Sequence, residues 1–177
     1  KQQALTRLKS ALENPEAVSR HPLANDLRSL SSKHNIPTDA LISLLDGLIS
    51  DTKRVAMSSQ GELDRYCFCV AGTVGLMMCP ILKVNDRRAL PFAIDLGIAM
   101  QLTNICRDVL EDAELGRRYL PLELTPLELR NASEAGKIRV QQTIADQLLR
   151  AEAFYQSGLQ GLAYLPRSSR IAILVAA

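Results

Sequence analysis

Apolar residues recur every three or four positions along most of the chain, and no stretch of useful length alternates between apolar and polar residues. This periodicity predicts helices and no strands. Asn14 and Pro15 are expected to end the first helix, and Pro22 to divide the second. Thr38 is expected to cap the third helix. The predicted helical segments cover residues 1–13, 16–33, 39–55, 62–82 and 91–115, with a polar loop at residues 58–61.

Residues 66–82 form an uncharged run, YCFCVAGTVGLMMCPIL, whose 17 residues reach the lower limit for a membrane span. Its glycines and proline, and the absence of a comparably long neighbour, favour instead a central helix buried on all sides. Small residues on one side would let another helix approach or leave room for an apolar ligand. That side carries Cys67, Ala71, Val74, Gly75 and Met78.

The helix that begins near Pro91 carries three oxygen-bearing side chains at four-residue intervals, those of Asn104, Asp108 and Asp112. On a helix this spacing places them in one row. Carboxylates in such a row repel one another by roughly 0.2–0.5 kcal/mol unless a cation lies between them. Mg²⁺ prefers oxygen ligands and is commonly held by one or two carboxylates together with substrate phosphates. The row is therefore a candidate site for Mg²⁺ carrying a phosphate.

The polar face of this helix lacks lysine and includes Gly97, which is unusual for a solvated surface. We expect it to form one wall of a polar cleft, although an ordinary surface helix would show the same periodicity. Gly116 would reverse the chain, and the Arg-Arg-Tyr sequence at residues 117–119 would form a flexible basic loop over an anion. Arg107 lies beside the row and can pair with Glu111 or with the anion.

Such a site suits the ionisation of a diphosphate ester better than its hydrolysis. Positive charge from metal and arginine would stabilise the diphosphate as its C–O bond breaks. An apolar neighbouring wall would keep water away from the fragment left behind.

The amino-acid composition argues against some classes of function. The 177 residues contain 47% hydrophobic residues, enough to bury a sizeable core, and are expected to form a single domain. Aromatic residues make up only 4% and the net charge is +2 with both signs interspersed, which argues against a nucleic-acid surface. Four cysteines without a nearby histidine indicate reduced thiols in a cytosolic-type protein rather than a zinc site. No secretory signal opens the chain.

Two long motifs carry a family resemblance. The segments QLTNICRDVLEDAELGRRYLP and YCFCVAGTVGLM, with their spacing, resemble the squalene and phytoene synthase family, most closely its phytoene synthase branch. LLDGLISD at residues 44–51 is similar to a weaker upstream signature of the family. FYQSGLQGLAYLPRSSRIAI, from Phe154 onward, is similar to its penultimate helix pair. The resemblance covers nearly the whole chain.

The resemblance implies an all-α, class I terpenoid synthase fold, in which a helical bundle surrounds a central apolar cavity. It implies a transferase that joins two prenyl diphosphates head to head through a cyclopropyl diphosphate, with geranylgeranyl diphosphate giving phytoene in carotenoid biosynthesis. The implied cofactor is Mg²⁺, with Mn²⁺ as an alternative. NADPH would be needed only if the product is squalene.

Site residues follow from the matched motifs, and the resemblance assigns each of them a role. Asn104, Asp108 and Asp112 would be metal ligands, and the two aspartates would be catalytic together with Tyr66. The substrate-binding residues would be Gln101, Arg107, Arg117 and Tyr119 near the diphosphates, and Ala71, Val74 and Gly75 along the prenyl tunnel.

One departure stands out. Family members carry a first Asp-x-x-x-Asp motif facing the second, and this chain has no other such pair. We therefore expect residues 1–177 to be the central part of the fold, truncated at both ends and inactive as it stands. The alternatives are a squalene or dehydrosqualene synthase using farnesyl diphosphate, a non-catalytic scaffold of the same family, and a helical interaction module. A cytoplasmic enzyme with peripheral membrane contact is expected, while donor length and oligomeric state stay open.

Overall fold

The computed structural model describes residues 1–14, 21–84 and 86–176, and its regular elements are helical throughout this part of the chain. The helices and helical turns are α1 (Gln2–Glu13), α3 (Pro22–His34), α4 (Thr38–Ser50), α5 (Gln60–Cys67), η1 (Phe68–Gly72), α6 (Thr73–Ile81), η2 (Arg87–Ala89), α7 (Leu90–Arg107), α8 (Val109–Glu114), α9 (Pro126–Arg130), α10 (Glu134–Gln160), η3 (Gly161–Tyr164) and α11 (Arg167–Ala176). An isolated bridge between Ala56 and Arg118 is the one extended pairing in the described residues. The prediction of helices without strands is confirmed for these residues.

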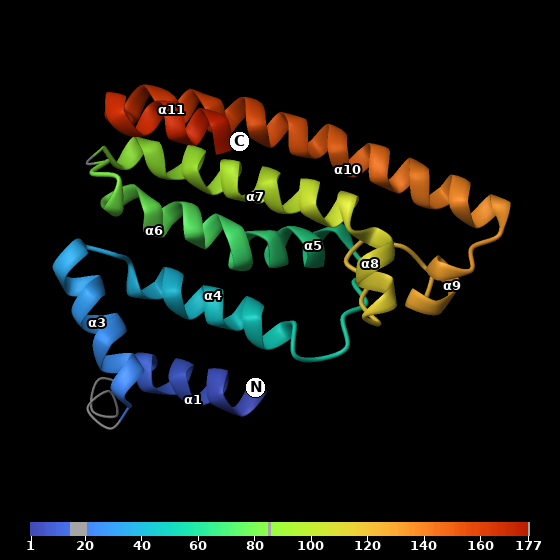
Figure 1. Cartoon of the computed structure of the whole chain (residues 1–177), viewed down its shortest axis with the longest axis horizontal. Coiled ribbons are helices and arrows are strands. Elements are labelled where there is room, and N and C mark those ends of the chain that lie inside the picture. Colours follow the sequence, from blue (N-terminus) through green and yellow to red (C-terminus); the bar gives the residue numbers. More distant parts are fainter. Residues whose placement is uncertain (15–20, 85, 177) are drawn as a thin grey trace.

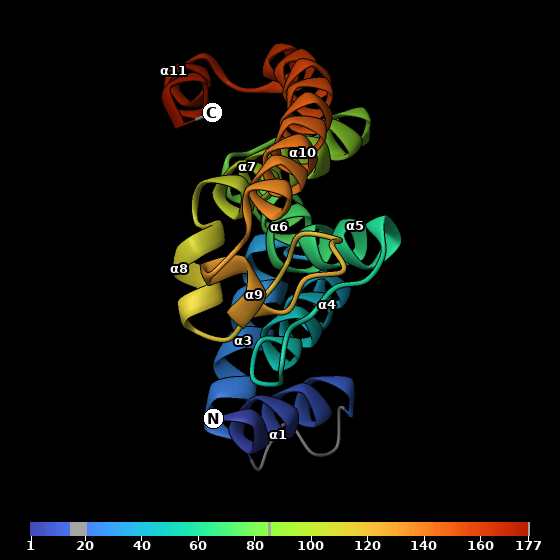
Figure 2. The same ribbon diagram turned by 90° about the vertical axis from the view of Figure 1, so that its right-hand side faces the viewer.

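The long helices lie in a stack (Figure 1). α10 packs along α7, which packs on the α5–α6 helix; α4 lies next and α1 forms the opposite edge, while α3 crosses one end. Seen after a 90° turn, the stack runs from α1 up to α10, with α8 and α9 grouped on one side (Figure 2). α7 is therefore the element against which most of the site is built.

Helix starts differ in detail from the sequence-based expectations. Thr38 was expected as an N-cap, but Pro37 holds the extended cap conformation and Thr38 is already helical, so its side chain caps nothing. Pro22 starts α3, in the early position that proline favours. The third predicted helix, expected over 39–55, ends at Ser50, so the loop after it is longer than predicted and covers residues 51–59. The Ser59 hydroxyl accepts from the Glu62 N–H and starts α5 at Gln60. The part of the second predicted helix at residues 16–20 lies outside the described residues.

A π-helical turn joins α5 to α6. The three elements form one uninterrupted helix over residues 60–81, with the wider turn at Phe68–Gly72. A π turn inserts one residue into the α register, so side chains before and after it no longer share a side. Cys67 is fully buried in the core while Ala71 faces a groove, which corrects the prediction that both lie on one side. The expectation of a helix buried on all sides is also wrong, since Val74 and Met78 are 40% and 37% exposed.

Two hydrophobic clusters hold the stack together. The larger one joins α5, α7, α8 and the segment around Tyr119, and contains the fully buried Leu63 and Leu102. The smaller one joins α1, α3 and α4 around Leu12.

Among the described residues, one stretch, Arg87–Arg107, is long and apolar enough to span a membrane, with a mean hydropathy of 1.4. Core helices of water-soluble proteins meet the same criterion, and α7 packs against helices on two sides.

Candidate active site

An open apolar groove of about 340 Å³ lies over α6 and α7. Gln101 and Asn104 supply its only amide side chains among the described lining residues, and both lie towards the C-terminal end of α7. Three residues predicted for the tunnel wall, Ala71, Val74 and Gly75, line it from η1 and α6. The remaining lining residues are Val70, Met78, Cys79, Leu82, Val84, Ala89, Phe92, Ala93, Leu96, Gly97, Met100, Gly158, Gly161, Leu162, Leu165 and Ile173.

Two glycines bring the helices under this groove into backbone contact. A Cβ atom on Gly75 would lie 2.1 Å from the Ala93 carbonyl oxygen, and one on Gly97 would lie 2.4 Å from the Ala71 carbonyl oxygen. Both distances are far below van der Waals contact, so only glycine permits this approach. The pairing of Gly75 with Ala93 and of Gly97 with Ala71 also shows that α6 and α7 run antiparallel.

A carboxylate bound by two tyrosines lies at the C-terminal end of α4. The Tyr66 hydroxyl donates to Asp51 Oδ2 at 3.0 Å, and the Tyr119 hydroxyl donates to Asp51 Oδ1 at 2.8 Å. The two rings stack with centroids 4.8 Å apart, and both side chains are buried. Burial, together with the neighbouring Asp51 charge, raises the pKa of Tyr119 to about 12, and it raises that of Tyr66 as well. Both hydroxyls are therefore neutral donors across the physiological pH range.

The predicted row of oxygen ligands is present, but it does not lie on one regular helix. α7 ends at Arg107 and α8 begins at Val109, because Asp108 adopts φ −101° and ψ 17° between them. The backbone bonds from Asp108 N–H to Asn104 O and from Asp112 N–H to Asp108 O persist at 2.9 and 2.8 Å. The row therefore bends at Asp108 while keeping its four-residue hydrogen bonding.

Arg107 pairs within the row, and not with Glu111 as the spacing suggested. Its Nε and Nη2 atoms each lie 2.7 Å from a carboxylate oxygen of Asp108. The guanidinium lowers the pKa of the Asp108 carboxyl below its usual value. Asp108 is therefore ionised, and its charge is already partly balanced by a neighbour.

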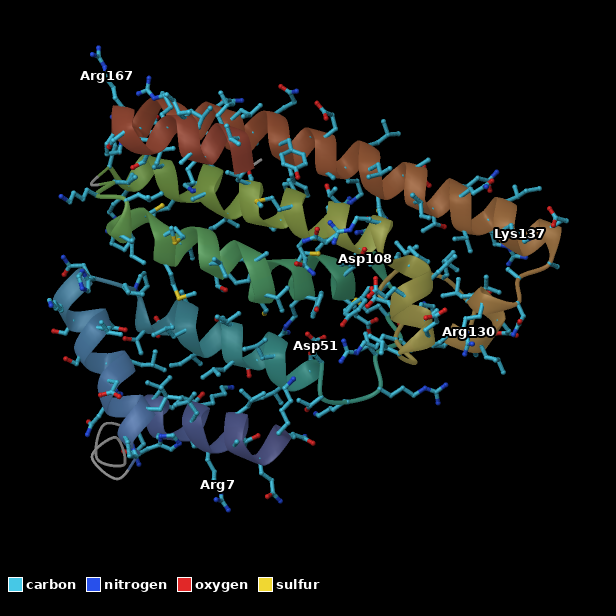
Figure 3. All side chains as sticks on the ribbon, in the orientation of Figure 1. Arg7, Asp51, Asp108, Arg130, Lys137 and Arg167 are labelled. Carbon is cyan, nitrogen blue, oxygen red and sulfur yellow. The ribbon has the colours of Figure 1, made fainter. Side chains whose placement is uncertain are left out.

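Asp112 is in a different electrostatic environment. Burial, and then the charge of Asp108, raise the pKa of the Asp112 carboxyl, with Glu111 and Asp51 adding to the effect and Arg117 opposing it. Excess negative charge therefore gathers at this end of the stack, where Figure 3 shows Asp51 at the end of α4 and Asp108 at the end of α7. A cation bound here would relieve that repulsion.

The basic loop after Gly116 differs from the prediction. Gly116 does reverse the chain, with φ 73°. The Arg118 side chain, expected in a flexible flap, is buried and donates to the carbonyl oxygens of Met57 and Leu120. Its backbone also pairs with Val55 and Met57. Arg118 thus fixes the segment that carries Tyr119 to Asp51, and only Arg117 remains partly exposed beside Asp112.

The donor set fits a hard divalent cation. Asp108 and Asp112 offer two carboxylates and Asn104 an amide oxygen, in accord with the one or two carboxylates by which proteins commonly hold Mg²⁺. Within the described residues no three His, Cys, Asp or Glu side chains converge on one point. A cation at this end would therefore take further ligands from water and phosphate.

Asp51 is the site residue that sequence reasoning missed, because it was placed only in the weaker upstream signature. A buried tyrosine normally pairs its hydroxyl, so the buried tyrosines of the two strong motifs implied an acceptor. Nothing in the sequence spacing identifies that acceptor, since Asp51 is 15 and 68 residues away from its two partners.

Comparisons with known proteins agree with this geometry. The chain is 36% identical to a 15-cis-phytoene synthase of Enterobacter agglomerans over 99% of its own length and 61% of that relative's. It is 39% identical to a phytoene synthase of Thermus thermophilus over 88% of the chain and 56% of the relative. The chain thus spans about half to three fifths of these curated relatives.

Solved structures show the same fold. A squalene synthase from Alicyclobacillus acidocaldarius superposes with a TM-score of 0.74 at 22% identity, over 87% of this chain and 60% of the other. A dehydrosqualene synthase in complex with ligand gives a TM-score of 0.70 at 25% identity, over 99% of this chain and 65% of the other. The fold is the all-α terpenoid synthase fold. The family model described as squalene/phytoene synthase matches residues 1–177. With its motifs, groove and fold in agreement with that match, the chain belongs to the squalene/phytoene synthase family.

Proposed function

We propose that the complete protein is a prenyltransferase that couples two prenyl diphosphates head to head, converting geranylgeranyl diphosphate to phytoene through a cyclopropyl diphosphate. The observation that carries this proposal is the order of apolar and polar side chains along the groove. Its apolar length ends at Gln101 and Asn104, and the chain continues directly into the carboxylates of Asp108 and Asp112. A molecule with a long apolar tail and an anionic head matches that order.

Each part of the site has a chemical role in this proposal. Asn104, Asp108 and Asp112 would hold Mg²⁺, or Mn²⁺ in its place, and Arg107 and Arg117 would lie near the diphosphate. When bound, the metal supplies positive charge that stabilises a departing diphosphate. The apolar groove excludes water from the reactive fragment.

Tyr66 and Tyr119 would act as neutral groups beside Asp51, at the C-terminal end of α4. Because both hydroxyls donate to Asp51, the two rings are held in one stacked arrangement. Neutral tyrosines are suited to lie beside a cationic fragment, since they carry no nucleophilic charge that would trap it.

The second candidate is coupling of farnesyl diphosphate to squalene or dehydrosqualene. The two structural neighbours, a squalene synthase and a dehydrosqualene synthase, favour keeping it. NADPH would be required for squalene only.

The test uses the complete natural gene product that contains these 177 residues. It would be incubated with Mg²⁺ and either geranylgeranyl or farnesyl diphosphate, and the extract examined for a C40 or C30 hydrocarbon. A C40 product supports the proposal and a C30 product the alternative. No coupled product from either donor would contradict both, and would favour a non-catalytic member of the family.

Asp108→Asn is the matching site variant. It should abolish product without loss of helical circular dichroism, because the Asp108 side chain is 30% exposed and, among the described residues, its ion pair is with its neighbour Arg107. Glu114→Gln is the control, since Glu114 is an exposed carboxylate of α8 outside the row. Retained turnover in Asp108→Asn would remove this residue from the metal site.

A further inference from the structure

Two adjacent arginines in the segment after α8 have different surroundings. Arg117 is partly exposed, whereas Arg118 is only 8% exposed. Burial and then the Asp108 charge raise the pKa of Asp112, and the Arg117 charge opposes that rise. Burial lowers the pKa of Arg118, and the Glu62 charge opposes that fall. The two guanidiniums therefore lie near different carboxylates, and Arg117 is the one that lies near the end of the oxygen row.

The backbone of Arg117 is fixed by the way in which α8 ends. The Arg117 N–H donates to the Asp112 carbonyl oxygen at 2.8 Å, and the Gly116 N–H donates to the Ala113 carbonyl oxygen at 3.1 Å. With Gly116 at φ 73°, these are the two hydrogen bonds of a Schellman motif. Arg117 is therefore held one backbone hydrogen bond away from the residue whose carboxylate its guanidinium accompanies.

An isolated parallel bridge fixes the residue that follows. The Arg118 N–H donates to the Val55 carbonyl oxygen at 2.9 Å, and the Met57 N–H donates to the Arg118 carbonyl oxygen at 3.0 Å. Successive side chains of an extended segment point to opposite faces, so Arg117 and Tyr119 share one side and Arg118 takes the other. A slip of one residue in this bridge would exchange the two sides, and would turn Arg118 towards the site in place of Arg117.

The Arg118 side chain holds this register. Its Nη1 atom donates to the Leu120 carbonyl oxygen at 2.8 Å and to the Met57 carbonyl oxygen across the bridge. Its Nε atom is buried without a hydrogen-bond partner among the described residues. Burying a guanidinium is costly unless its N–H groups are hydrogen-bonded. An apolar side chain would fill the same space without that cost, so the contribution of arginine here is the connection across the bridge.

We propose that Arg118 is a positioning residue of the diphosphate site, which fixes the register of the bridge and thereby keeps Arg117 beside Asp112. This inference rests on the proposed function, in which Arg117 lies near the diphosphate. Arg118 does not contact the ligand and acts through Arg117. Loss of Arg118 should therefore weaken diphosphate binding only while Arg117 is present.

The experiment measures binding without turnover. Calorimetric titration of the complete gene product with inorganic diphosphate and Mg²⁺ gives the affinity of the head-group site. Arg118→Met keeps an unbranched side chain but removes its donors, and should weaken binding by about tenfold or more, the effect of losing one hydrogen bond to a charged group. Arg117→Met should weaken it at least as much. The double variant should lose no more than Arg117→Met alone, because Arg118 then has nothing left to position.

A control variant and a direct readout of the bridge accompany this cycle. Arg130→Met removes the same charge from an exposed position of α9 (Figure 3) and should bind diphosphate like the natural protein. Hydrogen exchange of peptides covering residues 55–58 and 117–120 should quicken in Arg118→Met. Arg118→Lys keeps a donor for one carbonyl and should recover part of the affinity. If circular dichroism shows that Arg118→Met does not fold, the cycle uses Arg118→Lys, whose smaller loss should likewise vanish beside Arg117→Met.

The outcomes separate this inference from the proposed function. Additive losses would show that Arg118 binds diphosphate itself, and unchanged affinity in a folded Arg118 variant would show that it plays no part; either overturns the inference. A loss in Arg118→Met with full binding in Arg117→Met also overturns it. Any of these results together with coupled product contradicts only this inference. A non-additive loss without coupled product contradicts only the proposed coupling, and a natural protein that does not bind inorganic diphosphate contradicts both.

Discussion

Asp51 shows how a single side chain can fix the geometry of a site. Both of its carboxylate oxygens accept hydrogen bonds from buried tyrosine hydroxyls, one on α5 and one in the segment after α8. Hydrogen bonds to a charged acceptor are stronger than neutral ones, and a buried donor left unpaired is costly. Asp51 therefore connects three segments that are far apart in the sequence.

Asp51→Asn should destabilise the fold by about 1–3 kcal/mol, because the amide offers only one acceptor oxygen to two donors. Urea unfolding measures the loss. The matched control is Asp46→Asn on the same helix, whose carboxylate forms an exposed ion pair with Lys9 at 2.6 Å. Such a pair contributes at most about 1 kcal/mol. Equal losses in the two variants would contradict the role given to Asp51.

The two tyrosines also predict how stability changes at high pH. Tyrosine in an unfolded chain ionises near pH 10, whereas the pKa of folded Tyr119 is about 12 and that of Tyr66 is also raised. The folded state keeps these protons longer, so their contribution is complete below pH 10 and is lost as pH rises towards 12. Tyr119→Phe should therefore flatten the fall in unfolding free energy over this interval. An unchanged slope would show that Tyr119 is not protected.

At the scale of elements, two glycines without side chains determine how closely α7 packs on α6. Gly75 and Gly97 allow α6 and α7 to touch through their backbones, and the π turn at Phe68–Gly72 directs Ala71 and Val74 towards the groove. The same turn leaves Cys67 in the core. Helix length and periodicity were predictable from the sequence. The π turn and the break at Asp108 were not, because both depend on packing against other helices.

Gly75→Ala and Gly97→Ala should each destabilise the protein by about 1–3 kcal/mol, because the added methyl group overlaps a backbone carbonyl. They should also change groove binding, since the two helices must separate. Gly61→Ala on α5 is the control, as nothing lies within 4 Å of its Cβ position. It should be neutral or stabilising by up to about 1 kcal/mol. Thermal unfolding of the three variants makes the comparison, and tolerance of alanine at Gly75 would refute the close contact.

At the scale of the whole molecule, the two hydrophobic clusters are unequal. The cluster around Leu12 joins only α1, α3 and α4, while the larger one extends from Val55 to Ala151 and contains most of α7's buried residues. Fewer buried contacts mean a lower free energy of local opening. The edge formed by α1, α3 and α4 should therefore unfold locally while α7 and the helices packed on it stay folded.

Hydrogen exchange tests this difference. Leu12→Ala, at a side chain that is 1% exposed, should speed exchange in α1, α3 and α4 while leaving α7 and α10 protected. Leu63→Ala, at a fully buried position of the larger cluster, should speed exchange in α7 and α10 as well. Uniform acceleration by Leu12→Ala would show that the two clusters open together.

The sequence by itself determined the helical class and the family to which the two strong motifs point, because periodicity and motif spacing are local properties. Tertiary structure alone decided that Arg118 is buried and that Asp51 joins Tyr66 to Tyr119. These features depend on which distant segments meet, and burial and pairing across such contacts leave no regular spacing in the chain.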